Sequence, residues 1–256
     1  PPFWAPAQGQ PTIDSNVTWT CLGPSQTGLF FCTKKKRLQL RSMRTDSPPV
    51  EDFAAASALV EITPMAVDQF DTYARWDASS GHVVAGGSDP GGDEASEVPI
   101  YAPGSTNVTD LVLGYDGVLY IAVEGTLVLV DRRNRWPNAT LADPGFKFWR
   151  LAALPEGGVL ALDRDNPQLA RVSGLPLQSG PSDTPEPNIL TSCVANANPP
   201  HIVSRMALPA SERFVGLSML QQESGTQFAL LSWLNNDAAN QTAYVRTFAE
   251  GAAPGA

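Results

Sequence analysis

The sequence predicts an all-β fold built from repeated antiparallel meanders, and three observations lead to that prediction. The first is the stretch Asn107–Trp136, in which three short apolar runs alternate with glycine turns. The second is the turn chemistry, because Asp116-Gly117 between β-branched and aromatic residues is a strong hairpin signal. The third is the glycine content, which a helix would not tolerate. We therefore predict strands over Leu111–Leu113, Val118–Ala122 and Leu127–Val130.

The same pattern recurs along the chain and extends the prediction to the whole fold. A strand, a polar turn and a second strand follow one another at five places, with turn glycines at Gly28, Gly81, Gly117, Gly158 and Gly225. The step from Gly117 to Gly158 falls within the roughly 40–50 residue period of propeller blades, and the other steps require insertions. The predicted fold is a β-propeller, or a propeller-like array of about five antiparallel meanders.

The repeated strands also predict the hydrophobic core. Aromatic and aliphatic residues on these strands should be buried, because one face of each strand packs against a neighbouring sheet. The predicted core residues are Trp76, Leu113, Tyr120, Ile121, Leu129, Trp149, Leu160, Phe228 and Trp233.

Composition and charge limit the function classes. The 256 residues are 43% hydrophobic and 17% charged, which suits one all-β domain with a full core. A net charge of −9 argues against broad nucleic-acid binding, which depends on neutralising phosphates. The apolar runs fall short of the roughly 18–20 residues of a membrane span. The chain begins at Pro1 without a signal-like segment, so we expect it to be a piece of a longer protein.

The chain divides into three predicted parts. Residues 1–23 form an aromatic, proline-rich lead-in, residues 24–248 form the propeller-like domain, and residues 249–256 resemble a linker. Within the domain, the proline-rich insertion 173–200 interrupts the strands, and we expect it either to embrace a neighbouring subunit or to be solvated. Val50–Val60 is the only helix-compatible segment, because it is alanine-rich and follows two prolines.

Several motifs have two interpretations. Cys21 and Cys32 flank the first predicted turn, so they form either a disulfide or two small apolar strand positions, and the second is favoured. Cys193 has no obvious partner. The basic run Lys34–Arg37 is either a nucleic-acid patch or, as we favour, a solvated strand start. Four Asn-x-Thr triplets are interpreted as turn formers rather than glycan acceptors, and they begin at Asn16, Asn107, Asn138 and Asn240.

Two groups of motifs resemble phage-tail proteins. Val17–Gly23, with the sequence VTWTCLG, resembles the end of small modules in phage tail and tail-fibre proteins, which are credited with carbohydrate contacts. Longer stretches resemble the propeller-like region of tail proteins from contractile injection systems, namely Pro64–Trp76, Leu113–Tyr120, Leu129–Trp136 and Arg150–Arg164. The resemblance implies a structural or target-recognition subunit of the baseplate or its periphery, without catalytic residues to transfer. Its expected partners are other particle subunits and a cell-surface glycan, with assembly in the cytoplasm and release in an extracellular particle.

The search for catalytic chemistry leaves one alternative. His82 and His201 have no metal-ligand spacing, and Asp163–Asn166 lacks the remaining ligands of a calcium loop, so we expect no metal or cofactor. However, Asp116–Tyr120 also resembles repeats of gluconolactonase-type propellers. That resemblance implies a hydrolase with a metal ion held in a central channel. The candidate metal ligands under this alternative are Asp110, Asp163 and Glu212.

A recognition role would be expected in loops at strand ends. Three loops have unusual composition: Ser88–Glu97, Arg132–Asp143 and Ser173–Pro200. The second combines cations with an aromatic ring, which suits stacking on a sugar or pairing with acidic groups. The predicted binding residues are Arg132, Arg133, Arg135 and Trp136. The alternative is that Trp136 packs between two blades while the arginines remain solvated, and this interpretation is favoured.

Overall fold

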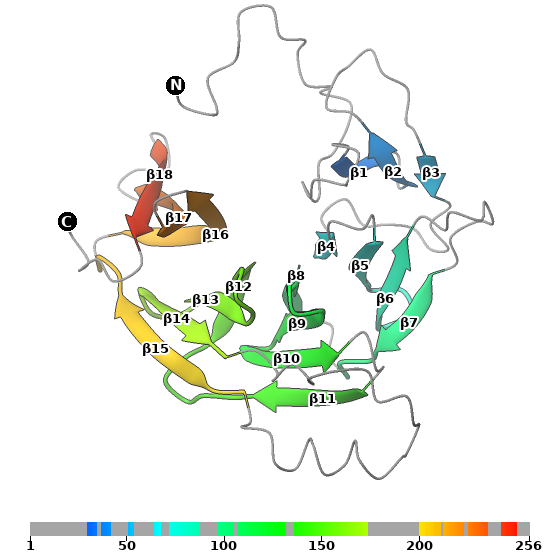
Figure 1. The fold of residues 1–256 in the computed structure, drawn as a ribbon, viewed down its shortest axis with the longest axis horizontal. Coiled ribbons are helices and arrows are strands. Elements are labelled where there is room, and N and C mark those ends of the chain that lie inside the picture. Colours follow the sequence, from blue (N-terminus) through cyan, green and yellow to red (C-terminus); the bar gives the residue numbers. More distant parts are fainter. Residues whose placement is uncertain are drawn as a thin grey trace, which may run out of the picture. The chain divides into compact units, whose positions relative to one another are not determined.

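The protein was analysed as a computed structural model, which describes residues 30–34, 37–41, 51–53, 64–67, 72–87, 97–104, 107–131, 136–173, 200–210, 212–222, 225–234 and 242–249. The regular elements among these residues are all β-strands, and they form five antiparallel sheets. Within each sheet, strands that follow one another in sequence are hydrogen-bonded neighbours (Figure 1). The predicted all-β array of antiparallel meanders is therefore confirmed.

Residues Pro1–Gly104 form one compact unit, which contains two of the sheets. Sheet A consists of β1 (Phe30–Lys34), β2 (Arg37–Arg41) and β3 (Glu51–Phe53). Sheet B consists of β4 (Met65–Val67), β5 (Thr72–Asp77), β6 (His82–Gly87) and β7 (Val98–Tyr101).

Residues Ser105–Ala256 form the second compact unit, with three sheets. Sheet C consists of β8 (Val108–Leu113), β9 (Val118–Val123), β10 (Thr126–Asp131) and β11 (Trp136–Leu141). Sheet D consists of β12 (Phe148–Ala153), β13 (Val159–Asp163), β14 (Gln168–Val172) and β15 (Ile202–Ala207). Sheet E consists of β16 (Arg213–Gln222), β17 (Gly225–Leu234) and β18 (Thr242–Ala249). The first strand of sheet D contacts the first strands of sheets C and E.

The predicted turn glycines occupy turns where the backbone needs them. Gly81, Gly117 and Gly158 have φ angles of 70°, 77° and 81°, in the left-handed region that a side chain makes costly. Gly225 begins β17 and pairs with Gln222, the last residue of β16. Gly28 lies outside the described residues.

Two predictions near the N-terminus need correction. Residues Glu51–Phe53 are strand β3 and not part of a helix over Val50–Val60, because they pair with β2 and cross-strand pairing overrides helix propensity. The rest of that segment is outside the described residues. The basic run Lys34–Arg37 leads into a strand as predicted, because β2 begins at Arg37; the correction is that its first residue, Lys34, ends β1 and pairs with Arg37.

The buried apolar residues of both units follow the predicted strands. Of the nine predicted core residues, six are buried: Trp76, Leu113, Tyr120, Ile121, Leu129 and Leu160. Trp149 is only partly buried, and the guanidinium of Arg150 lies over its ring at 4.7 Å. The side chains of Phe228 and Trp233 lie outside the described set. One cluster joins sheets C and D, with Tyr120, Leu129 and Leu151 among its members.

The two ends of the proline-rich insertion are held together. Ser173 N–H donates to the carbonyl of His201 at 3.0 Å, and His201 N–H donates to Ser173 Oγ at 3.1 Å. The insertion is therefore placed between β14 and β15 of one sheet. Residues 174–199 are outside the described part, as are the predicted lead-in 1–23 with Cys21, and residues 250–256 of the linker-like end.

Candidate functional site

The predicted binding segment falls largely outside the described residues. Nothing is described for Arg132, Arg133 and Arg135, and the side chain of Trp136 is also outside the described set. The backbone of Trp136 is the first residue of β11 and pairs with Asp131 of β10. Trp136 therefore begins a strand and is not part of a turn. The role of this segment stays a prediction.

A second group of polar side chains joins the first strands of three sheets, and we call it the inner seam: Thr109, Asp110, Arg150 and their main-chain partners. Asp110 Oδ2 accepts the N–H of Leu151 at 2.8 Å. Arg150 Nη1 donates to the carbonyl of Thr109 at 2.7 Å, and Arg150 Nε donates to the carbonyl of Val215 at 3.2 Å. The seam therefore links β8, β12 and β16.

The inner seam has a clear physical cause. The strands β8, β12 and β16 each lie at an edge of their sheet, so alternate main-chain groups face away from the ladder. An unpaired buried N–H or C=O destabilises the fold. Charged side chains on one of these edge strands bond to the main-chain groups of the next: Asp110 of β8 accepts an N–H of β12, and Arg150 of β12 donates to a carbonyl of β16. Thr109 adds to this pattern, because its Oγ1 donates to the carbonyl of Trp149 at 3.3 Å.

The environment of Asp110 changes its acidity. Burial raises the pKa of this carboxyl to about 6, although the N–H of Leu151, the charge of Arg150 and the N–H of Leu111 act in the opposite direction. Among the described residues, Arg150 is the charged group whose interaction with Asp110 lowers the pKa of its carboxyl. A carboxyl with such a pKa changes charge between pH 5 and 7, so the seam contains a titratable group near neutrality.

A separate carboxylate joins the turns of sheets C and D. Asp116 Oδ2 accepts the hydroxyl of Tyr120 at 2.6 Å and the N–H of Gly158 at 3.0 Å. Its Oδ1 accepts the N–H of Val118 at 3.1 Å. Burial and the bonded Asp116 carboxylate raise the pKa of the Tyr120 hydroxyl. Asp116 is thus a buried acceptor that fixes its own turn and holds it to the next sheet.

The three candidate metal ligands do not come together in the structure. Asp110 lies within β8 in the inner seam, whereas Asp163 accepts N–H groups from Asp165, Asn166 and Gln168 in its own turn. Glu212 precedes β16 and pairs with Arg246 of β18. No group of three or more His, Cys, Asp or Glu side chains that could hold a metal ion is found in the described part of the chain. The proposed shared metal site of these three residues is therefore wrong.

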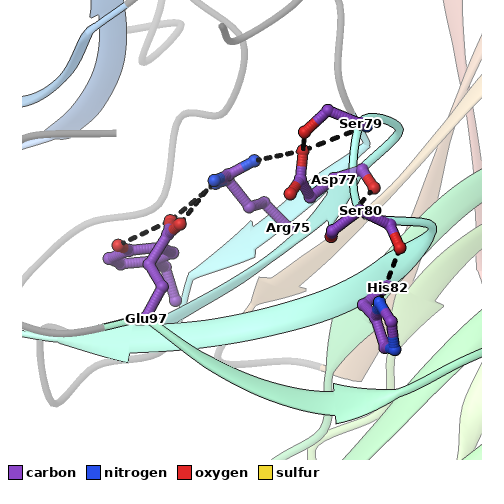
Figure 2. Close-up of polar contacts among 7 residues, drawn as sticks. Arg75, Asp77, Ser79, Ser80, His82 and Glu97 are labelled. Atoms are coloured by element: carbon purple, nitrogen blue, oxygen red, sulfur yellow. Dashed lines mark hydrogen bonds and ion pairs between the residues drawn. The ribbon is translucent and has the colours of Figure 1, made fainter. Parts of the chain in front are cut away.

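Among the described residues, a strongly buried charged cluster lies in sheet B (Figure 2). Arg75 of β5, only 1% exposed, donates through Nε to Glu97 at 2.6 Å and through Nη2 to the same carboxylate. Its Nη1 lies 3.8 Å from Asp77, which also accepts the hydroxyl of Ser79 at 2.8 Å. Tyr73 donates its hydroxyl to Glu97 at 3.0 Å, and burial together with Glu97 raises its pKa. The cluster therefore holds Glu97, the residue before β7, against β5.

Glycine makes room for this cluster. Gly86 is the cross-strand partner of Tyr73, and a Cβ at that position would overlap the phenol ring. The ring can therefore extend across β6 toward Glu97. Arg75 and Arg150 were not predicted from the sequence, and the available signal was an arginine flanked on both sides by apolar strand residues. Among the described atoms, His82 Nδ1 lies 2.7 Å from the carbonyl of Ser80, and His201 Nδ1 lies 3.3 Å from Ser173 Oγ, 28 positions away in the sequence.

Comparison with known proteins bears on the fold. No protein-family model matches the sequence, and no curated protein matches it. The structure is similar to a streptogramin B lyase, with a TM-score of 0.55 and 10% identity over 91% of this chain and 70% of that one. It is similar to virginiamycin B lyase from Staphylococcus aureus, with a TM-score of 0.53 and 11% identity over 91% and 71%. It is also similar to the β-propeller domain of Cps50 (Swd1) from Myceliophteria thermophila, with a TM-score of 0.57 and 12% identity over 91% and 74%.

At these identities the likeness concerns the fold and not the activity. It agrees with the five sequential meanders and with the absence of helices among the described elements. The chain therefore has a β-propeller-like fold.

The described residues also include no helix of the length and apolarity needed to cross a membrane.

Proposed function

We propose that this chain is a structural subunit of a phage-tail-like contractile particle, at the baseplate or its periphery, and that it acts by binding other proteins. The supporting observation is the use of its charged side chains. Asp110, Asp116 and Arg150 each bond to main-chain groups of a neighbouring sheet. Side chains used in this way build a rigid scaffold, which is what a particle subunit requires. The assignment to a contractile particle rests on the sequence resemblance described above.

The experiment is size-exclusion chromatography of the full-length protein in lysate from its native source. We expect the protein to elute in a complex of megadalton size, together with other tail-like subunits identified by mass spectrometry. Recovery only as a free monomer would contradict the proposal. Dissociation of the complex in high salt and its recovery on dialysis would separate assembly from aggregation.

A recognition role is included in the proposal. A cell-surface glycan would be contacted by Arg132, Arg133, Arg135 and Trp136, because guanidinium groups and an aromatic ring suit sugar hydroxyls and sugar faces. In this scheme the protein is assembled in the cytoplasm and released in the particle. Binding of purified particles to target cells, before and after removal of surface polysaccharide, tests the scheme.

The alternative is a metal-dependent propeller hydrolase of the gluconolactonase type. One observation favours it: Asp110 lies on the first strand of its sheet and its pKa is raised to about 6, a range suited to acid–base catalysis. Against it, the carboxylate is already bonded to the N–H of Leu151. Metal analysis of the purified protein distinguishes the two functions. A stoichiometric, tightly held divalent ion together with lactone hydrolysis would favour the enzyme.

A further inference from the structure

Sheet E repeats the strand register of sheets C and D. In all three sheets the first strand has one extra residue against the second strand, namely Thr109 in β8, Trp149 in β12 and Val215 in β16. The second and third strands then pair without a break in register, as β9 with β10, β13 with β14 and β17 with β18. By position and register, β18 is therefore the equivalent of the third strands β10 and β14.

Sheets C and D each have a fourth strand, whereas sheet E has three strands among the described residues. The fourth strands β11 and β15 pair with the outer edges of β10 and β14. No described strand lies beside the outer edge of β18, so its outward row of main-chain N–H and C=O groups is open there. Side-chain exposure agrees, because Val128 of β10 and Ala170 of β14 are 3% and 1% exposed, whereas Val245 of β18 is 64% exposed.

The last strands of the other four sheets have features that resist pairing with another chain. Each of β7, β11 and β15 has a break in register against its third strand. β7 and β11 also contain Pro99 and Pro137, which cannot donate a main-chain hydrogen bond. β3 is only three residues long, and two of them are acidic. In contrast, the eight residues of β18, Thr242–Ala249, include no proline and pair with β17 without a break.

The open edge of β18 specifies the chemistry of what would cover it. An extended polypeptide strand matches such an edge, because it offers main-chain donors and acceptors at the same spacing. A second copy of this chain brings a strand of the same length with the same open edge, namely its own β18. A twofold axis through the middle of β18 makes the two strands antiparallel, which is how third and fourth strands pair in sheets B, C and D. All eight residues then have a partner, and Val245 lies opposite Arg246 of the second copy.

The charges at this edge are compatible with the approach of a second copy. The side chains described in β18 are Val245, Arg246 and Thr247, and all three are exposed. Arg246 Nε donates to Glu212 at 2.7 Å, so the arginine is neutralised within its own chain. In the twofold register the two arginines are also not directly opposite each other. β18 contains no lysine, the residue that natural edge strands use to keep other chains away.

We propose that two copies of this chain associate edge to edge through β18. The two copies of sheet E then form one continuous six-stranded sheet, with the two β18 strands at its centre. The pairing closes on itself, so it produces a dimer and not an open-ended chain of copies. This inference concerns the purified protein and does not depend on the proposed role in a particle.

The test is sedimentation velocity of the purified full-length protein over a range of concentrations. We expect a monomer–dimer equilibrium for the wild type. The double substitution Val245→Lys with Thr247→Lys should raise the dissociation constant at least about tenfold, because it places like charges along the joined edge. Both side chains are exposed, so the monomer should melt within a few degrees of the wild-type monomer. The matched control is Val203→Lys, an exposed valine on the bulged strand β15, and it should dimerise like the wild type.

Hydrogen exchange gives a second measurement, which needs no variant. The outward-facing amides of β18 should exchange more slowly as the protein concentration rises, because they become bonded to the second copy. The amides of β15 should exchange at the same rate at every concentration. Slowing of both strands alike, or of neither, would contradict the proposed contact.

The other outcomes assign the edge to a different occupant. A wild-type protein that stays monomeric at every concentration would overturn the inference. Protection of the outward β18 amides in that monomer would assign the edge to another segment of the same chain, and protection only within a high-mass complex would assign it to a different subunit. Equal dimerisation of the wild type and the double-lysine variant would show that the contact lies elsewhere. A protein that dimerises through β18 but enters no high-mass complex would support this inference and refute the proposed function.

Discussion

The carboxylate of Asp116 accepts the N–H of Gly158 at 3.0 Å, although the two residues are 42 positions apart. This bond joins a turn of sheet C to the equivalent turn of sheet D. The hydroxyl of Tyr120 donates to the same oxygen at 2.6 Å, so this one carboxylate oxygen satisfies two buried donors. Contacts between consecutive sheets therefore rest on particular polar side chains in addition to the apolar core.

Replacing Asp116 with Ala should destabilise the fold by about 2–4 kcal/mol, because the N–H of Gly158 and the hydroxyl of Tyr120 lose their acceptor in a buried site. Chemical denaturation monitored by circular dichroism measures the change. The control is Asp165→Ala, which removes an exposed carboxylate paired with Arg164. A change no larger for Asp116→Ala than for this control would contradict the assigned role.

Asp110 should make the stability depend on pH. Its pKa in the folded protein is about 6, above the usual value of 3.8, so folding favours the protonated form. The stabilisation is complete below about pH 4 and is lost as the pH rises through 6, which changes the free energy of unfolding by on the order of 3 kcal/mol. Denaturation at several pH values checks this. Asp110→Asn keeps an oxygen acceptor for the N–H of Leu151 but cannot ionise, so it should remove this part of the pH dependence of the free energy of unfolding. An unchanged pH profile in this variant would contradict the assignment of the pH dependence to Asp110.

The Arg75–Glu97 pair should show the asymmetry of buried ion pairs. Glu97→Ala leaves the guanidinium of Arg75 without its main partner and should lower the free energy of unfolding by about 3 kcal/mol. The double variant Arg75→Met with Glu97→Met should recover much of that loss, because neither charge of this pair is left buried without the other. Thermal denaturation measures the stability of the single and the double variant against that of the wild type. A double variant as unstable as the single variant would show that the charges themselves stabilise sheet B.

Truncation of a predicted core residue should be costly. Leu160 is buried and packs with other apolar side chains of sheet D, so Leu160→Ala should destabilise by about 2–5 kcal/mol. Leu113→Ala is expected in the same range. Val203 of β15 is exposed, and Val203→Ala should cost less than about 0.5 kcal/mol. Urea denaturation of the three variants provides the measurement, and equal effects for Leu160 and Val203 would contradict the core assignment.

The predicted recognition role of Trp136 is tested by Trp136→Ala, with binding to the target surface and the melting temperature measured together. Lost binding at an unchanged melting temperature would support recognition. A lowered melting temperature without a specific binding defect would instead place the ring between two sheets. Since the backbone of Trp136 begins β11, the second outcome is the one that strand packing favours.

Local interactions explain why much of the strand pattern could be predicted from the sequence. The hairpins around Gly117 and Gly158 follow from turn residues and alternating apolar runs, which act over only a few positions. The same local reasoning fails at Glu51–Phe53, where pairing with β2 outweighs alanine-rich propensity. The resemblance to gluconolactonase-type propellers singled out Asp110, but as a metal ligand, whereas the structure places it as an acceptor for a main-chain N–H group.

Only the tertiary structure decided what the charged residues do. Arg150 reaches the carbonyl of Val215, 65 positions away, and Asp110 reaches the N–H of Leu151, 41 positions away. These partners are main-chain groups left unpaired at sheet edges, and every residue type carries such groups. No sequence pattern distinguishes them, because the packing of one sheet against the next determines which edge group meets which side chain.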